Sequence, residues 1–101
     1  MTTQELHDLL MREFPNMDWK PKRQNNSYIV ATVENREYLA RIGQFADHVH
    51  NGAEYISIGF DSLIYGCTNP IIGWEKAKQQ MRENILRYDH QLLESEQLTL
   101  F

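Results

Sequence analysis

The sequence predicts an α+β fold, with an N-terminal helix, a three- to four-stranded antiparallel meander and a long C-terminal helix. Two observations support this prediction. Near both ends of the chain, apolar residues recur every three or four positions, as in a helix buried on one side, whereas in the middle they alternate with polar residues, as in a strand. The 101 residues are 42% apolar and 24% charged, which suits one ordinary globular domain. We expect that domain to span residues 1–95.

The first helix is expected over about residues 3–14. Thr2 and Glu5 have the spacing of a capping box, in which each side chain accepts a hydrogen bond from a backbone N–H at the start of a helix. Leucines follow at helical spacing until Pro15, which ends the pattern. The helix is therefore short and amphipathic.

The next stretch, residues 16–26, is polar and basic and is interrupted by Pro21. Proline lacks a backbone donor and is typical of turns and loops, so we interpret this stretch as a connecting loop. Its Met17 and Trp19 are expected to fold back onto the core.

Three strands are expected in the middle of the chain, over residues 27–34, 37–45 and 53–60, because apolar side chains alternate in each. Asn51-Gly52 is the strongest hairpin signal, since a type I′ turn needs positive φ at both central residues. That turn would join residues 47–50 to the third strand. Whether residues 63–67 form a fourth strand or an irregular return stays open.

The longest helix is expected to open at Asn69-Pro70, because Asn caps helices well and Pro is tolerated at the first helical position. It would run for about 24 residues, or roughly 35 Å, which is longer than a small sheet is wide, so its C-terminal end is expected to project. Its buried stripe is expected to contain Ile71, Trp74, Ala77, Met81, Ile85, Leu86, Tyr88, Leu92 and Leu93.

Apolar residues return after the helix, in the last five residues, Gln-Leu-Thr-Leu-Phe, which do not continue the helical stripe. This pentapeptide (residues 97–101) resembles the bacterial sliding-clamp-binding motif, of the form Gln-Leu-Ser/Asp-Leu-Phe. Polymerases and mismatch-repair proteins use that motif to dock on the β ring of DNA polymerase III. We expect residues 96–101 to form a clamp-binding tail.

The resemblance implies a role for each residue of the tail. Gln97 would make the polar anchor contacts, and Leu98 would occupy the first part of the groove. Leu100 and Phe101 would fill its deep apolar pocket. Thr99 replaces the usual Ser or Asp and keeps a small hydroxyl at the solvent-facing position. Burial of these apolar side chains, offset by the entropy of ordering a peptide, would give about micromolar affinity.

A basic and aromatic cluster, Trp19, Lys20, Lys22 and Arg23, lies within residues 16–26. Cations and rings are what single-stranded nucleic acid contacts, so this cluster is a candidate for weak DNA contact. A solvated loop with an anchoring Trp has the same composition, and both interpretations stay open. The net charge of −4 argues against a general binder of phosphate backbones.

No residue pattern indicates catalysis, and we predict no catalytic residue, cofactor or metal. His48 and His50 lie near Asp47 and Glu54, but two imidazoles without a fixed third ligand are a weak metal signal, and we interpret them as exposed hairpin residues. Cys67 is the one cysteine, so no internal disulfide can form, and without an identifiable base we interpret it as a small buried residue.

The chain has no apolar run of the ~20 residues that span a membrane and no signal-peptide pattern, so we expect a cytoplasmic protein. The favoured function is that of a small non-enzymatic protein that docks on the replication clamp as an accessory or inhibitor, of the kind found on phages and other mobile elements. One alternative is a clamp-tethered module that binds or modifies DNA. Another is a structural protein whose tail packs in its own core or in a homodimer.

Overall fold

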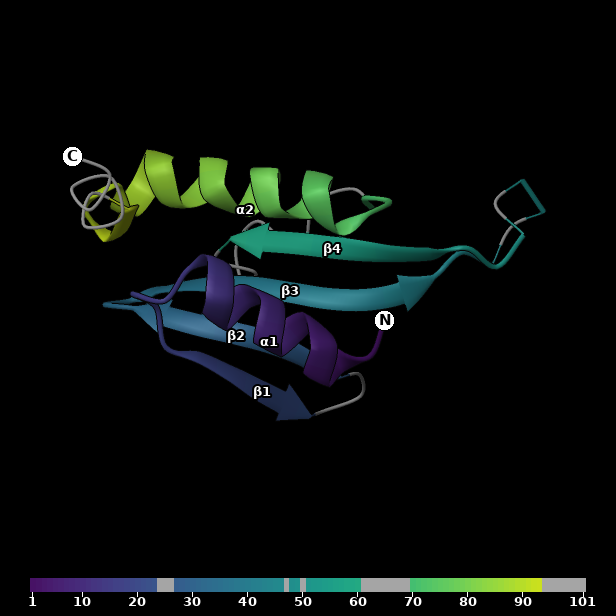
Figure 1. The fold of residues 1–101 in the computed structure, drawn as a ribbon, viewed down its shortest axis with the longest axis horizontal. Helices are drawn as coiled ribbons and strands as arrows, with labels where there is room; N and C mark the ends of the chain where they lie inside the picture. The colour runs from purple at the N-terminus through teal and green to yellow at the C-terminus, as the bar shows by residue number, and fades with distance from the viewer. Residues whose placement is uncertain (24–26, 47, 50, 61–69, 94–101) are drawn as a thin grey trace.

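The computed structural model describes residues 1–23, 27–46, 48–49, 51–60 and 70–93, and it has the predicted α+β class (Figure 1). One antiparallel sheet has its strands in the order β1-β2-β3-β4, which is a simple meander. The elements are α1 (Thr3–Glu13), β1 (Trp19–Arg23), β2 (Ser27–Val33), β3 (Arg36–Gln44), β4 (Glu54–Phe60) and α2 (Trp74–Asp89).

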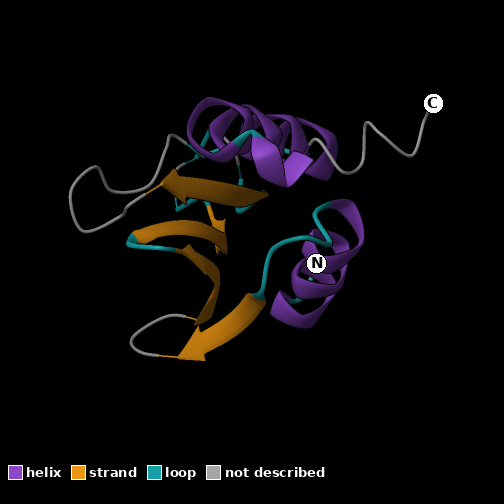
Figure 2. Ribbon diagram, turned by 90° about the vertical axis from the view of Figure 1, so that its left-hand side faces the viewer, coloured by secondary structure: helices purple, strands orange, loops and turns teal. Residues whose placement is uncertain are grey.

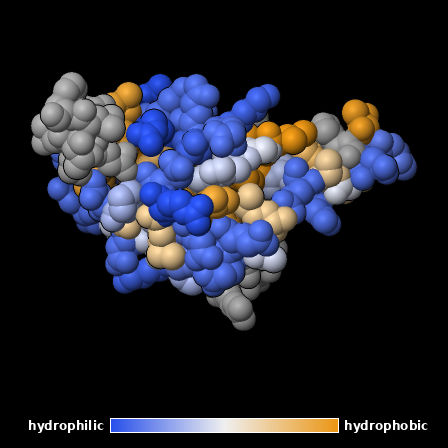
Figure 3. Space-filling view, viewed as in Figure 1, coloured by the Kyte–Doolittle hydropathy of each residue, from blue (hydrophilic) through white to orange (hydrophobic). Residues whose placement is uncertain are grey.

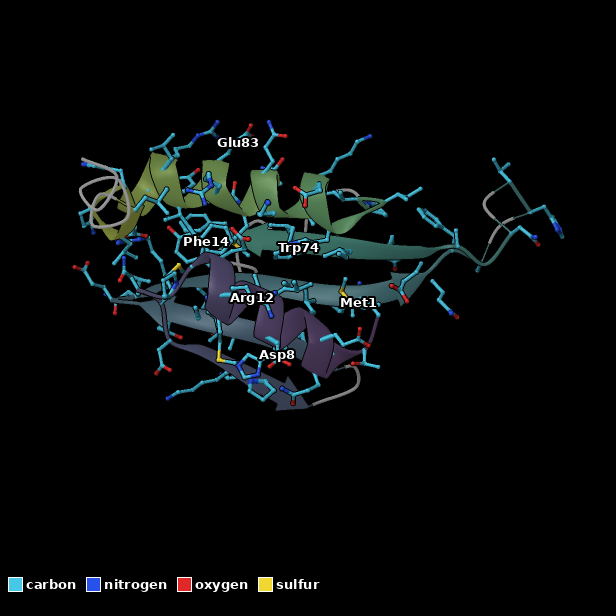
Figure 4. All side chains as sticks on the ribbon, in the orientation of Figure 1. Met1, Asp8, Arg12, Phe14, Trp74 and Glu83 are labelled. Atoms are coloured by element: carbon cyan, nitrogen blue, oxygen red, sulfur yellow. The ribbon has the colours of Figure 1, made fainter. Side chains whose placement is uncertain are left out.

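Both helices lie on the concave side of the curved sheet (Figure 2). The helix α1 contacts β1 and β2, and α2 contacts β4 at the other edge. Phe14, which follows α1, lies between the two helices, and the guanidinium carbon of Arg82 is 5.4 Å from the centre of its ring (Figure 4). Hydrophilic side chains make up much of the outward side of α2 (Figure 3), where Leu86 and Tyr88 are also exposed.

The core lies between the concave face and the two helices. Trp19 pairs with Ala31, Ala31 with Tyr38, and Tyr38 with Phe60, so one row of side chains crosses all four strands on this face. The predicted alternation of apolar residues is thereby confirmed. The buried members of the core are Leu6, Leu10, Phe14, Met17, Trp19, Ile29, Ala31, Tyr38, Ala40, Ile56, Ile58, Ala77, Met81, Ile85 and Leu93.

The start of α1 has the predicted capping box. The Thr2 hydroxyl accepts from the Glu5 backbone N–H at 3.1 Å, and the Glu5 carboxylate accepts from the Thr2 N–H at 3.1 Å. The helix ends at Glu13, one residue before the predicted end. Two of the N–H groups that a helix start leaves without partners are satisfied in this way.

The interpretation of residues 16–26 as a loop is wrong for the part that forms β1. This strand lies at the edge of the sheet. Pro21 has no backbone N–H to donate, and an edge strand tolerates this because its open side has no neighbouring strand to receive a hydrogen bond. The prediction that Met17 and Trp19 fold back onto the core is confirmed, since their side chains are 7% and 4% exposed.

The turns follow the sequence signals in part. Asn51 and Gly52 have φ of 52° and 75°, the positive values expected at this site. The hairpin is wider than predicted, because β3 ends at Gln44 and Phe45 donates its backbone N–H to the Ala53 carbonyl at 2.9 Å. Residues 63–67, the candidate fourth strand, lie outside the described residues.

The predicted start of the long helix is wrong. Ile71 forms a bridge to Ile56 on the outer edge of β4, with backbone N···O distances of 2.8 and 2.9 Å, so the chain is extended here. Gly73, with φ of 98°, turns it into α2, which begins at Trp74. Two members of the predicted stripe are also wrong, because Leu86 is 54% exposed and Tyr88 44% exposed, whereas Ile85 and Leu93 are buried and Leu92 packs against the core.

Candidate functional site

The predicted clamp-binding residues, Gln97 to Phe101, lie outside the described residues, so their role stays a prediction. The described chain ends at Leu93, which is buried at 3% exposure and belongs to the core. The fifteen buried side chains of that core lie between Leu6 and Leu93 in the sequence.

The basic and aromatic cluster is divided between the two faces of the sheet. Trp19 points to the concave side, where its indole N–H donates to the Phe14 carbonyl at 3.1 Å. Because its ring is buried, it has no face open for stacking on a base in this structure. Lys20 and Lys22 are exposed, and the side chain of Arg23 lies outside the described part of the chain.

The two lysines line a hollow of about 230 Å³ on the convex face, the side of the sheet away from both helices, together with Asp18, Val30 and Thr32. Lys20 lies opposite Val30 in the strand pairing, and its ammonium is 3.3 Å from the Asp18 carboxylate. Both partners of that pair are well exposed, at 68% and 77%, so it is a weak, screened interaction. The hollow combines two cations and the Thr32 hydroxyl, which can bind an anion such as phosphate, with the Asp18 carboxylate, which opposes such binding.

A buried polar cluster, which is absent from the predictions made from the sequence, joins the end of α2 to the sheet. Asp89 is fully buried at 0% exposure. Its carboxylate accepts from the Arg36 guanidinium through Nε at 3.2 Å and through an Nη group, and it also accepts from the Tyr38 hydroxyl. Arg36 and Tyr38 lie two residues apart on β3, so both reach the same face.

The cluster shifts the acidity of its members. Burial alone would raise the pKa of Asp89, but the hydrogen bonds from Arg36 and Tyr38 outweigh burial and hold that pKa below its usual value. Burial, and then the hydrogen bond to Asp89, raises the pKa of Tyr38. The carboxylate is thus kept charged and the phenol kept neutral near pH 7, and their hydrogen bonds join the end of α2 to β3.

One signal in the sequence points to this cluster. Asp89 follows Met81 and Ile85 at a spacing of four, which places a carboxylate on the buried side of α2. A buried carboxylate needs a cationic or hydrogen-bonding partner. The identity of that partner has no local signal, because Arg36 is 53 residues away in the sequence.

Two further contacts fix the chain just after α2. The Asn16 side-chain amide donates to the Leu92 carbonyl at 2.7 Å, and the Leu93 N–H donates to the His90 carbonyl at 3.0 Å. With Leu93 in the core, the chain is attached to the folded domain up to residue 93. The prediction of a projecting helix end is wrong for the described residues.

The candidate metal and thiol residues lie partly within the described residues and partly outside them. His48 is exposed, as predicted, whereas Asp47, His50 and Cys67 lie outside the described residues. In the parts of the chain that are described, no three His, Cys, Asp or Glu side chains gather closely enough to hold a metal ion.

Among the described helices, none combines the length and apolar character needed to cross a membrane. A scan of protein-family models gave no match to the chain. Searches of curated proteins and of solved structures likewise found no significant match.

Proposed function

We propose that this protein is a non-enzymatic ligand of the bacterial replication sliding clamp, which it binds through residues 97–101. The observation that carries the proposal is the sequence Gln-Leu-Thr-Leu-Phe itself. Such a ligand competes for the groove with polymerases and repair proteins that carry the same motif, or it brings its own folded domain to the replication site.

Within the described residues, α1 contacts β1 and β2 and α2 contacts β4, and a core forms between these helices and the sheet. Leu98, Leu100 and Phe101 would each contribute about 1.5 to 3 kcal/mol when buried in a groove, part of which offsets the entropy of ordering the peptide. The expected dissociation constant is therefore about micromolar.

Calorimetric titration of the full chain into a bacterial β clamp tests the proposal. The double variant Leu100→Ala/Phe101→Ala is expected to bind at least about 100-fold more weakly, since it lacks the side chains that fill the deep pocket. Ile72→Ala is a suitable control, because Ile72 is an apolar residue that is 54% exposed and lies outside the pentapeptide. Equal binding by all three chains, or binding by none, contradicts the proposal.

Deletion of residues 97–101 separates docking from a structural role. Under the docking proposal, the free energy of unfolding changes by less than about 0.5 kcal/mol, as for an ordinary surface change. A loss of several kcal/mol, or a shift from dimer to monomer in ultracentrifugation, would instead indicate that the pentapeptide packs in its own core or in a homodimer.

A second candidate function is contact with single-stranded DNA at the convex face, which the hollow beside Lys20 and Lys22 favours. In this version the clamp motif tethers a module that binds DNA weakly. The double variant Lys20→Ala/Lys22→Ala should weaken binding of a labelled oligonucleotide and reduce the salt dependence of log K by about 1.4, at about 0.7 per cation lost. Lys76→Ala, which removes an exposed cation from α2, is the control, and no measurable binding by the unaltered chain rules this function out.

A further inference from the structure

We propose that the exposed last turn of α2, formed by Leu86, Arg87 and Tyr88, contacts the clamp when residues 97–101 occupy its groove. This inference rests on the proposed function and adds a second contact surface to it. Three observations support it: the attachment of the chain at Leu93, the short distance in sequence from there to the motif, and the character of the exposed turn.

The chain is attached to the folded domain at Leu92 and Leu93. Leu93 is 3% exposed within the core, and the Leu92 carbonyl is hydrogen-bonded to Asn16 at 2.7 Å. Just before it, Asp89 is hydrogen-bonded to Arg36 and Tyr38 on β3. Moving Leu93 away from the domain would require breaking these contacts, so the domain must follow the motif.

Three residues, Glu94 to Glu96, separate Leu93 from Gln97. Whatever its conformation, a chain of four steps spans at most about 14 Å. When the motif is bound, Leu93 is therefore held within about 14 Å of Gln97, and the part of the folded domain around Leu93 lies close to the ring.

The last turn of α2, which ends a few residues before Leu93, has the composition of a binding site. The described residues include six exposed large apolar side chains, and two of them, Leu86 at 54% and Tyr88 at 44%, are in the last turn of α2. Arg87 lies between them and is also exposed. The ring of Tyr88 is stacked on Phe60 at 4.0 Å between centroids, so it is held rigidly and loses little entropy on binding. Aromatic and Arg side chains are enriched at the energetically dominant positions of interfaces.

The test compares variants of the full chain in titrations against a bacterial β clamp. Leu86→Ala is expected to weaken binding about 5-fold, as for truncation of a contributing interface residue. Ile72→Ala is the matched control, since Ile72 has the same 54% exposure but lies before the other end of α2. Unfolding curves of both variants check that the fold is retained, which we expect because alanine is a good helix former.

A second variant breaks the proximity and leaves the motif intact. Sixteen Gly/Ser residues inserted between Glu96 and Gln97 would add a flexible linker of about 22 Å root-mean-square length. Binding is then expected to weaken several-fold, because the domain contact no longer acts at high effective concentration. In the extended chain, Leu86→Ala should not weaken clamp binding any further, because the insertion has already removed the contact that Leu86 makes. The two changes are then non-additive, which a double-mutant cycle measures.

The outcomes separate this inference from the proposed function. If the extended chain binds as tightly as the unaltered chain, or if Leu86→Ala binds as tightly as Ile72→Ala, the second contact does not exist, although the motif still binds. If Leu100→Ala/Phe101→Ala has no effect or no chain binds, the proposed function fails and this inference fails with it.

Discussion

At its C-terminal end α2 is attached to β3 through a buried carboxylate, whereas its N-terminal end follows a backbone bridge between Ile71 and Ile56 on β4. Asp89 uses charge-assisted hydrogen bonds in a site closed to water. At the other end the cap residue is Gly73, which has no side chain that could cap the helix. The comparison indicates that side-chain chemistry fixes the end nearest the pentapeptide, and backbone geometry fixes the other.

The largest effect is expected at the carboxylate. Asp89→Asn keeps the shape of the side chain but removes its charge, so the hydrogen bonds from Arg36 and Tyr38 become weaker or unsatisfied. We expect the free energy of unfolding to fall by about 2 to 3 kcal/mol at pH 7, measured by urea denaturation. Glu83→Gln makes the same chemical change at an exposed position of α2 and should be close to neutral. A loss of less than about 0.5 kcal/mol for Asp89→Asn would show that the buried cluster does not fix this end.

The same variant has a defined pH dependence. The pKa of Asp89 is lowered in the folded state, so its contribution is fully present above the ordinary value of 3.8 and is lost as the pH falls through the folded-state pKa. The stability difference between the unaltered chain and Asp89→Asn should therefore shrink below about pH 4. A difference that stays constant down to pH 2 would contradict the lowered pKa.

The next effect is expected at the N-terminal end of α2. Gly73 has φ of 98° and ψ of 143°, a conformation that is costly for residues with a Cβ. Nothing lies within 4 Å of a Cβ added there, so the cost of Gly73→Ala is one of backbone conformation, about 2 kcal/mol. Ile72→Ala, one residue earlier and without positive φ, should cost less than about 0.5 kcal/mol in the same denaturation experiment. Equal effects would mean that the turn before α2 adapts freely.

The start of α2 and two other turns of the chain show what local sequence can predict. The capping box at Thr2 and Glu5 and the positive φ at Asn51 and Gly52 depend on neighbouring residues, and both were predicted. The start of α2 was misplaced because the cap-like pair Asn69-Pro70 is a local signal, whereas pairing of Ile71 with β4 is a tertiary one. Local preferences give way where a distant partner satisfies the backbone.

The strand β1 and the buried cluster were missed for related reasons. Pro21 and the lysines suggest a loop, and it is the edge position in the sheet that makes them acceptable in a strand. Asp89 has a helical spacing that marks it as buried, but only the fold brings Arg36 beside it. For the candidate site, the pentapeptide can be found from sequence because a linear motif needs no tertiary structure. The exposed turn of α2 cannot, since Leu86 and Tyr88 had the spacing of core residues.

A smaller effect is expected from the phenol of the cluster. Tyr38→Phe removes one hydrogen bond to Asp89 and should cost about 1 kcal/mol at pH 7. The pKa of Tyr38 is raised in the folded state, so its contribution is full below the ordinary value of 10.0 and is lost as the pH rises above it. Denaturation between pH 9 and 11 should therefore show a loss of stability in the unaltered chain that is reduced in Tyr38→Phe. Tyr28→Phe, on the convex face, is the control. If both variants reduced the loss of stability between pH 9 and 11 equally, that loss could not be assigned to Tyr38.

The smallest effect is expected at Lys78, in the first half of α2. Its ammonium is 2.9 Å from the Glu75 carboxylate and 4.0 Å from that of Glu13 on α1. These pairs lie at the surface, where water and salt screen them, so Lys78→Ala should lower the melting temperature by at most about 2 °C. That small shift should vanish in 1 M salt, where the screening length is about 3 Å. Lys76→Ala provides the control for loss of a cation from the same helix. If Lys78→Ala were as destabilising as Asp89→Asn, side-chain pairing would hold both ends of α2, and the contrast between a charge-fixed end and a backbone-fixed end would be wrong.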